Sequence, residues 1–149
     1  MTLEETKQKH MDQASDAIIY LNNATEKIYS ISIKEKLATL KRKLQDLRDL
    51  QYWFDSGEKE LDRLYNRYIP YLKTIIENYI KLETSWNHDE LERVRNKLLH
   101  TLDEFIDTIR VISEILPQDE IDNANAEAKA KKAKEELDMR FRKLYEESN

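Results

Sequence analysis

The sequence predicts an all-α protein, a single domain over residues 1–149 that folds as an up-and-down antiparallel bundle of four to five long helices. Three observations predict this class. Apolar residues recur at alternating steps of four and three residues, the spacing of one helix face. The 149 residues include one Gly and two Pro, too few for the tight turns of a multi-stranded antiparallel sheet. Charged residues make up 37% of the chain and apolar residues 40%, a mixture typical of amphipathic helices.

The first helix is expected over residues 3–29. Its thin apolar face, interrupted by a polar Thr25, consists of Met11, Ala14, Ile18, Leu21 and Ile28. Residues 30–32 break the pattern. Ser32 and Glu35 then have the spacing of a capping box, in which the hydroxyl and the carboxylate satisfy amides of the first helical turn. We therefore expect a new helix to begin at residue 33.

The second helix is expected over residues 33–54. Its apolar face has one polar interruption, Gln51, and otherwise consists of Ile33, Leu37, Leu40, Leu44, Leu47 and Phe54. Gly57 follows as the only glycine of the chain, and Gly is the residue best able to adopt the left-handed conformation that closes a helix. We expect Gly57 to close the second helix in this way.

The third helix, expected over residues 58–84, has the most regular apolar stripe. Its members are Leu61, Tyr65, Tyr68, Leu72, Ile75, Tyr79 and Leu82. Pro70 lies off this stripe, lacks a backbone donor and crowds the carbonyl of Asn66, so we expect a kink there. A proline inside a helix costs about 3 kcal/mol relative to Ala, which packing of the Tyr-rich stripe must outweigh.

The fourth helix is expected to run from its N-cap Asn87 to residue 116, where Pro117 stops it. It has the widest apolar face and should lie centrally; the members are Leu91, Val94, Leu98, Leu102, Phe105, Ile109, Ile112 and Leu116. The short connections between helices favour antiparallel neighbours.

The fifth helix is expected over residues 119–146. Its inner positions are mostly small: Ile121, Ala126, Ala130, Ala133, Leu137, Phe141 and Leu144. Because alanines bury little apolar area, this helix either lies close against the bundle or extends away and pairs with a second copy of the chain as a homo-oligomer. The polar ends, residues 1–10 and 145–149, are expected to fray.

Composition excludes several kinds of site. The absence of cysteine rules out disulfides, thiolate metal sites and a Cys nucleophile. The net charge of −5 argues against general nucleic-acid binding, although the basic stretch over residues 33–48 leaves binding to nucleic acid or a membrane surface as a minor alternative. No apolar run reaches the length of a transmembrane segment, and the N-terminal residues lack a signal-peptide core. We expect a cytoplasmic protein; a membrane anchor upstream of residue 1 would leave the same pattern.

The titratable residues give no recognisable catalytic, cofactor or metal site. His10, His88 and His100 lie outside the helical spacings that bring two metal ligands to one face, and a surface or half-buried position is expected for each. Asp103 and Asp107 flank Glu104 on the fourth helix, where a solvated acidic face is the expected role. We therefore expect no catalytic residue, no metal and no cofactor.

Exposed aromatic residues are the better candidates for a functional surface. Tyr52 and Trp53 end the second helix, and Tyr71 follows Pro70 without belonging to the apolar stripe. Tyr and Trp dominate the hot spots of protein interfaces. If these three side chains are exposed together, they form a partner-binding patch; core packing is the alternative.

One segment resembles a known family. Residues 63–82 read RLYNRYIPYLKTIIENYIKL. This stretch resembles the helix R-F-x-x-Y-Y-L-P-x-x-x-K-L-L-x-x-Y-x-x-L of the bacterial 5-bromo-4-chloroindolyl phosphate hydrolysis (XpaC-like) proteins. Arg67 and Thr74 stand where the family usually has Tyr and Lys. The matching positions are Arg63, Tyr68, Pro70, Ile75, Ile76, Tyr79 and Leu82. A looser similarity extends over residues 20–138.

The resemblance implies a link to hydrolysis of a chromogenic phosphate ester and to toxic-anion-resistance (TelA-like) proteins. Our interpretation is a non-catalytic protein-interaction or scaffold module, for which a TelA-like helical protein is the implied partner. Its partner-binding residues are expected to be Tyr52, Trp53, Tyr71, Arg63 and Arg67. The alternative is a phosphate-ester hydrolase or an accessory factor for one, with Arg63 and Arg67 beside Tyr68 as the nearest candidates for a phosphate clamp.

Overall fold

The computed structural model describes residues 1–118 and 124–148, and over these residues the predicted all-α bundle is confirmed. The helices are α1 (Leu3–Glu26), α2 (Ile31–Trp53), α3 (Glu58–Arg63), α4 (Ile69–Glu83), α5 (His88–Gln118) and α6 (Ala124–Ser148). A π-helical turn, η1 (Leu64–Tyr68), joins α3 to α4, so that α3, η1 and α4 form one continuous rod. No described helix has both the length and the apolar character needed to cross a bilayer.

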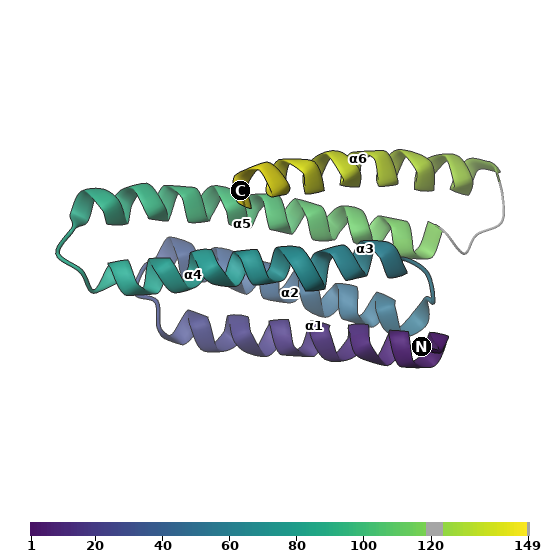
Figure 1. The fold of residues 1–149 in the computed structure, drawn as a ribbon, viewed down its shortest axis with the longest axis horizontal. Helices are drawn as coiled ribbons and strands as arrows, with labels where there is room; N and C mark the ends of the chain where they lie inside the picture. The colour runs from purple at the N-terminus through teal and green to yellow at the C-terminus, as the bar shows by residue number, and fades with distance from the viewer. Residues whose placement is uncertain (119–123, 149) are drawn as a thin grey trace.

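Four rods form the core of the bundle: α1, α2, the rod from α3 to α4, and α5, while α6 packs outside on α5 (Figure 1). Helix direction alternates along the chain, as predicted. The neighbours in space are less simple, because α2 packs mainly against α1 and α5 rather than against the helix that follows it. Since α2 and α5 run in the same direction (Figure 1), not all neighbours are antiparallel.

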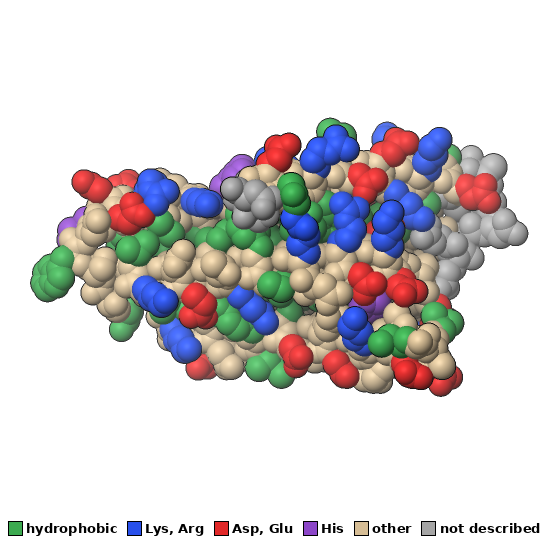
Figure 2. Space-filling view, viewed as in Figure 1, with side chains coloured by type: hydrophobic (Ala, Val, Ile, Leu, Met, Phe, Trp, Pro, Cys, Tyr) green, Lys and Arg blue, Asp and Glu red, His purple; other side chains and the backbone are tan. Residues whose placement is uncertain are grey.

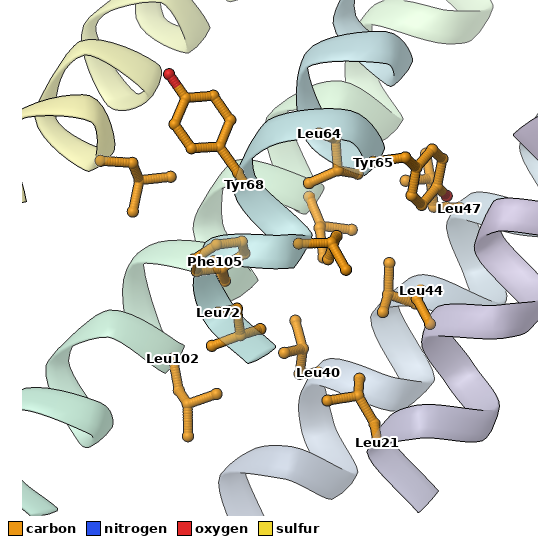
Figure 3. Close-up of a cluster of buried hydrophobic side chains, with 14 of the residues drawn as sticks. Leu21, Leu40, Leu44, Leu47, Leu64, Tyr65, Tyr68, Leu72, Leu102 and Phe105 are labelled. Carbon is orange, nitrogen blue, oxygen red and sulfur yellow. The ribbon is translucent and has the colours of Figure 1, made fainter. Parts of the chain in front are cut away.

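The core is a layer of Leu and aromatic side chains to which each of the four rods contributes (Figure 3). Leu21 comes from α1, Leu44 from α2, Leu72 from α4 and Phe105 from α5, and these four are at most 2% exposed. The predicted stripe of the second helix is confirmed: Ile33, Leu37, Leu40, Leu44 and Leu47 are all fully buried, and the polar Gln51 is buried with them.

The buried face of α1 differs from the predicted one. Met11 and Ile18 are only partly buried. The buried residues are His10, Ala14, Ala17, Leu21, Ala24 and Ile28. The face is rotated toward the small Ala17 and Ala24, which allow the backbone of α1 to approach its neighbours closely. Counting only large apolar residues therefore gave the wrong edge of the stripe.

The connection between α1 and α2 begins earlier than expected. α1 ends at Glu26, and the N-cap of α2 is Ser30, whose hydroxyl accepts from the amide of Ile33 at 3.5 Å. The predicted capping box of Ser32 is therefore wrong. The carboxylate of Glu83 on α4 accepts from the amides of residues 29 and 30, both at 2.9 Å, and this contact fixes the turn against the end of α4.

Gly57 is left-handed, as predicted, with φ of 79°. It is the N-cap of α3, however, and not the residue that closes α2, which ends at Trp53 with Phe54 extended. A Cβ at Gly57 would lie 2.6 Å from Cδ1 of Leu116. Gly57 is thus required both by its backbone conformation and by the close approach of α5.

A π turn precedes Pro70, at the place where a kink was expected. The amide of Ile69 bonds the carbonyl of Leu64, five residues back, and exposed Pro70 falls in the first turn of α4, where a missing donor matters least. The extra residue buries adjacent pairs on both sides of the turn. The predicted stripe from Leu61 to Tyr79 is buried throughout.

Pro117 does not stop α5, which continues to Gln118 with Pro117 in its last turn. The predicted cap at Asn87 is confirmed, because its Oδ1 accepts from the amide of Glu90 at 3.1 Å. Residues 3–10, which were expected to fray, form the first turns of α1, and His10 is 3% exposed.

The alanine-rich helix α6 lies against α5, the first of the two expected arrangements. Its buried residues are Ala130, Ala133, Leu137, Phe141 and Leu144. The expected start at residue 119 and the inner positions Ile121 and Ala126 lie outside the residues or side chains that the structure describes. Self-association through this helix stays a prediction.

Candidate functional site

One face of α5 is covered by α6 over its C-terminal half and is open over its N-terminal half (Figure 1). Near the end of α6, Lys143 Nζ lies 2.8 Å from Oε1 of Glu104, so the covered part of α5 begins close to residue 104. Beyond this point the face continues toward the start of α5 and borders α4. A groove of about 410 Å³ lies between the two helices there.

This surface, the α4–α5 groove, has an apolar floor and a basic rim. Ile75, Leu82 and Val94 form the floor, and Val94 is 8% exposed. The polar lining residues are Asn78, Lys81, Glu90, Arg93 and Lys97. Three cations against one carboxylate give the lining a net charge of +2. Figure 2 shows hydrophobic surface between α4 and α5 on the uncovered half of the molecule.

The charges on the rim of the groove are not equally available. Arg93 donates from Nε to Glu90 at 3.1 Å, and this hydrogen bond lowers the pKa of Glu90. Neither Lys81 nor Lys97 forms an ion pair within the described part of the chain. The two lysines therefore remain available to a ligand that carries carboxylates.

The face of α5 changes sign between its covered and open halves. In the covered half, Glu104 and Asp107 present carboxylates to α6, and Arg140 of α6 reaches them at 3.5 and 3.6 Å. In the open half, Arg93 and Lys97 present cations. A helix that extends the packing of α6 along this face would need carboxylates where α6 has cations.

A second groove lies between η1 and α6. This arginine groove, about 480 Å³ in volume, is lined by Arg63, Arg67, Tyr68, Asp138, Arg142 and Tyr145. Lys and Arg side chains gather along this boundary in Figure 2. Tyr68 points toward α6 (Figure 3), where its ring stacks on Phe141 at 4.7 Å and its hydroxyl donates to the carbonyl of Phe141.

Aromatic rings hold two of the three arginines. The guanidinium of Arg63 lies 4.3 Å above the ring of Phe141, and its Nη1 bonds Asp138 at 2.7 Å. The guanidinium of Arg67 lies 4.2 Å above the ring of Tyr145. Arg63 and Arg67, two of the expected partner-binding residues, are therefore brought together, with Arg142 as a third cation that the sequence did not connect to them.

The expected aromatic patch is not formed. Tyr52 and Trp53 are exposed, at 60% and 74%, and meet edge to face at 5.2 Å. Tyr65 bonds Gln51, the residue before Tyr52, and Tyr71 lies six residues or about 9 Å of helix rise farther along the rod. Half-buried Tyr71 therefore does not join the exposed pair.

The exposed aromatic pair and the arginines also lie against different helices. The ring of Tyr52 approaches Lys7 of α1, whereas Arg63 and Arg67 contact α6. The five residues expected to bind a partner therefore do not form one surface.

The histidines and carboxylates occupy different positions from those expected. His10 is buried, and its Nε2 lies 2.7 Å from Oδ1 of Asp62, which links α1 to α3. Glu104 is not on a solvated face, because it is 14% exposed and binds Arg140 and Lys143. Among the residues searched, those that the structure describes, no three His, Cys, Asp or Glu side chains are placed to hold a metal ion.

The floor of the α4–α5 groove was missed because Ile75 and Val94 belong to the predicted core stripes. The length of the helices carries the signal that could have found it. α6 has 25 residues and α5 has 31, so α6 cannot cover the whole face of α5.

Comparison with known proteins adds no relative: no protein-family model matches the chain, and neither a curated protein nor a solved structure matches it. The resemblance of residues 63–82 therefore stays a prediction from the sequence.

Proposed function

We propose that this protein is a non-catalytic helical interaction module whose α4–α5 groove binds an acidic amphipathic helix of a partner protein. The observation that carries the proposal is the continuation of one α5 face. That face packs α6 over one half and carries an apolar floor with a basic rim over the other half. Helix-in-groove binding uses this combination of apolar anchors and flanking charges.

The open half has room for a short helix. It extends over residues 88–100 of α5, which at 1.5 Å per residue gives a length of about 20 Å, or three to four helical turns. Apolar anchors at positions i, i+3, i+4 and i+7 of the bound helix would cover Ile75, Leu82 and Val94. Carboxylates on its flanks would meet Lys81 and Lys97.

The sign of the charge favours an acidic occupant over a second α6. The end of α6 that packs nearest to the groove carries Arg140 and Lys143, which suit Glu104 but would repel Arg93 and Lys97. A partner of the TelA-like helical class, as the sequence resemblance implies, is the candidate source of the helix.

The proposal is tested with two synthetic amphipathic peptides of equal length that share Leu anchors. One peptide has Glu and the other has Lys at the flanking positions. Fluorescence anisotropy with the full chain should show saturable binding of the Glu peptide and much weaker binding of the Lys peptide. Combining Lys81→Glu with Lys97→Glu should reverse this preference, whereas Lys43→Glu on the exposed face of α2 should not. Equal binding of both peptides by the natural sequence would contradict the proposal.

Phosphate-ester hydrolysis is a second candidate, supported by the three guanidinium groups of the arginine groove and by the resemblance of residues 63–82. Purified protein is assayed with a chromogenic phosphate ester, with and without divalent metals. Turnover that persists through purification and is lost in Arg63→Gln or Arg67→Gln would favour a hydrolase over a non-catalytic module.

A further inference from the structure

We propose that the arginine groove between η1 and α6 is a binding site for a small phosphomonoester, whose dianionic phosphate is held by Arg67 and Arg142. This inference does not depend on the α4–α5 groove or on turnover. It rests on the placement, charge and surroundings of the three arginines that line the groove.

The arginines converge from two helices that are far apart in the sequence. Arg63 and Arg67 are four residues apart along α3 and η1, and Arg142 lines the same groove from α6. A guanidinium presents several donors in a fixed plane that matches the oxygens of a phosphate. Two or three such groups around one space form the kind of clamp that binds phosphate through paired charge-assisted hydrogen bonds.

The groove carries more positive charge than the packing of α6 requires. Asp138 neutralises Arg63 at 2.7 Å, and this pair alone links α6 to α3. Arg67 and Arg142 form no ion pair with a described residue, and Arg142 has no described contact that attaches α6 to the bundle. The lining therefore has a net charge of +2 in a chain whose net charge is −5, which matches a dianion.

Aromatic contacts hold these cations in place before any ligand arrives. The ring of Phe141 supports Arg63 and the ring of Tyr145 supports Arg67, at 4.3 and 4.2 Å. An arginine that is already ordered loses less side-chain entropy when it binds an anion. The rings thus favour binding without adding negative charge.

The volume of the groove indicates that the ligand is larger than inorganic phosphate. About 480 Å³ is available, and the ring of Tyr145, which is 46% exposed, provides an apolar wall. An aromatic or alkyl group on the phosphate oxygen would cover this wall. A phosphomonoester with an apolar group should therefore bind more tightly than phosphate itself.

Isothermal titration of the full chain with phenyl phosphate, inorganic phosphate and phenol tests the site. Phenyl phosphate should bind at one site per chain, inorganic phosphate should bind more weakly, and phenol should not bind. Arg142→Gln should weaken the binding of phenyl phosphate about tenfold, since it removes a charge-assisted hydrogen bond. Lys97→Gln, in the α4–α5 groove, is the matched control and should leave the affinity unchanged.

Asp138→Asn separates ligand binding from a structural role. If the groove binds a dianion, removing this carboxylate leaves Arg63 unpaired, and the affinity for phenyl phosphate should rise several-fold. If the arginines only attach α6, the same change should weaken α6 and give no gain in binding. Thermal unfolding of both variants shows whether they remain folded. The absence of saturable binding at millimolar phenyl phosphate, an unchanged affinity in Arg142→Gln, or a loss of affinity in Asp138→Asn would each overturn the proposal.

Discussion

Glu104 on α5 binds Arg140 on α6: Oε2 of the carboxylate lies 3.5 Å from Nη1 of the guanidinium, and only 14% of the Glu104 side chain is exposed. Lys143 reaches the other oxygen of the same carboxylate at 2.8 Å. Two cations of α6 thus converge on one half-buried anion of α5. This charge pattern attaches the alanine-rich helix, whose small side chains bury little area, and it ends where the α4–α5 groove begins.

Replacing Glu104 by Gln should loosen α6 selectively. The change leaves Arg140 and Lys143 without their shared carboxylate, and a hydrogen bond to a charged group contributes about 1.5–3 kcal/mol. Hydrogen exchange of the α6 amides should become faster, while exchange in α2 stays slow. Glu114→Gln is the matched control, because its carboxylate is 52% exposed beside Arg110 and an exposed pair contributes about 0–1 kcal/mol. Equal effects of the two variants would show that Glu104 does not anchor α6.

Gly57→Ala should destabilise the fold by about 2–3 kcal/mol. About 1 kcal/mol comes from the left-handed backbone and the rest from contact between the new Cβ and Leu116. Denaturant unfolding measures the change. In a Leu116→Ala background the same substitution should cost about 1 kcal/mol less, because the contact is relieved and the backbone strain remains. A cost that does not depend on residue 116 would contradict the packing explanation.

Tyr65 should make the protein less stable in alkaline solution. Burial raises the pKa of its phenol well above the ordinary value of about 10, against smaller opposing effects of Arg48 and the Gln51 hydrogen bond. The folded state therefore favours the neutral phenol. This contribution is fully present below pH 10 and is lost as the pH rises from 10 toward the higher pKa of the folded state.

Tyr65→Phe tests this pH dependence. The variant should be less stable at pH 7 by about 1–2 kcal/mol, because Oε1 of Gln51 loses the donor that lies 2.5 Å away. Above pH 10 its stability should fall less steeply than that of the natural sequence. Tyr20→Phe should change the slope in the same direction, since burial also raises the pKa of Tyr20. Parallel curves for Tyr65→Phe and the natural sequence would rule out a titrating Tyr65.

The sequence predicts a stripe well where large apolar residues alone define it. The faces of α2 and of the rod from α3 to α4 were predicted residue by residue, because Leu, Ile and Tyr outnumber the other inward positions. The face of α1 was misplaced, because Ala17 and Ala24 are inward and small and His10 is inward and polar. Burial of His10 depends on Asp62, a residue that lies 52 positions away.

The grooves could not be predicted in the same way. Val94 has the spacing of a core residue, and only the position at which α6 ends decides that it lies at the floor of an open groove. Arg142 likewise joins Arg63 and Arg67 only because α6 returns along η1. Periodicity defines the inward face of each helix, but it does not define where a neighbouring helix begins and ends along that face.

Methyl NMR of the full chain, titrated with the Glu-flanked amphipathic peptide, tests the central claim most directly. The account predicts that the methyl signals of Ile75 and Val94 shift in a saturable way, while those of Ile112 and Leu137, which are buried on α5 and α6, do not. Saturable binding of the peptide with unshifted Ile75 and Val94 signals, or no binding at all, would contradict the account.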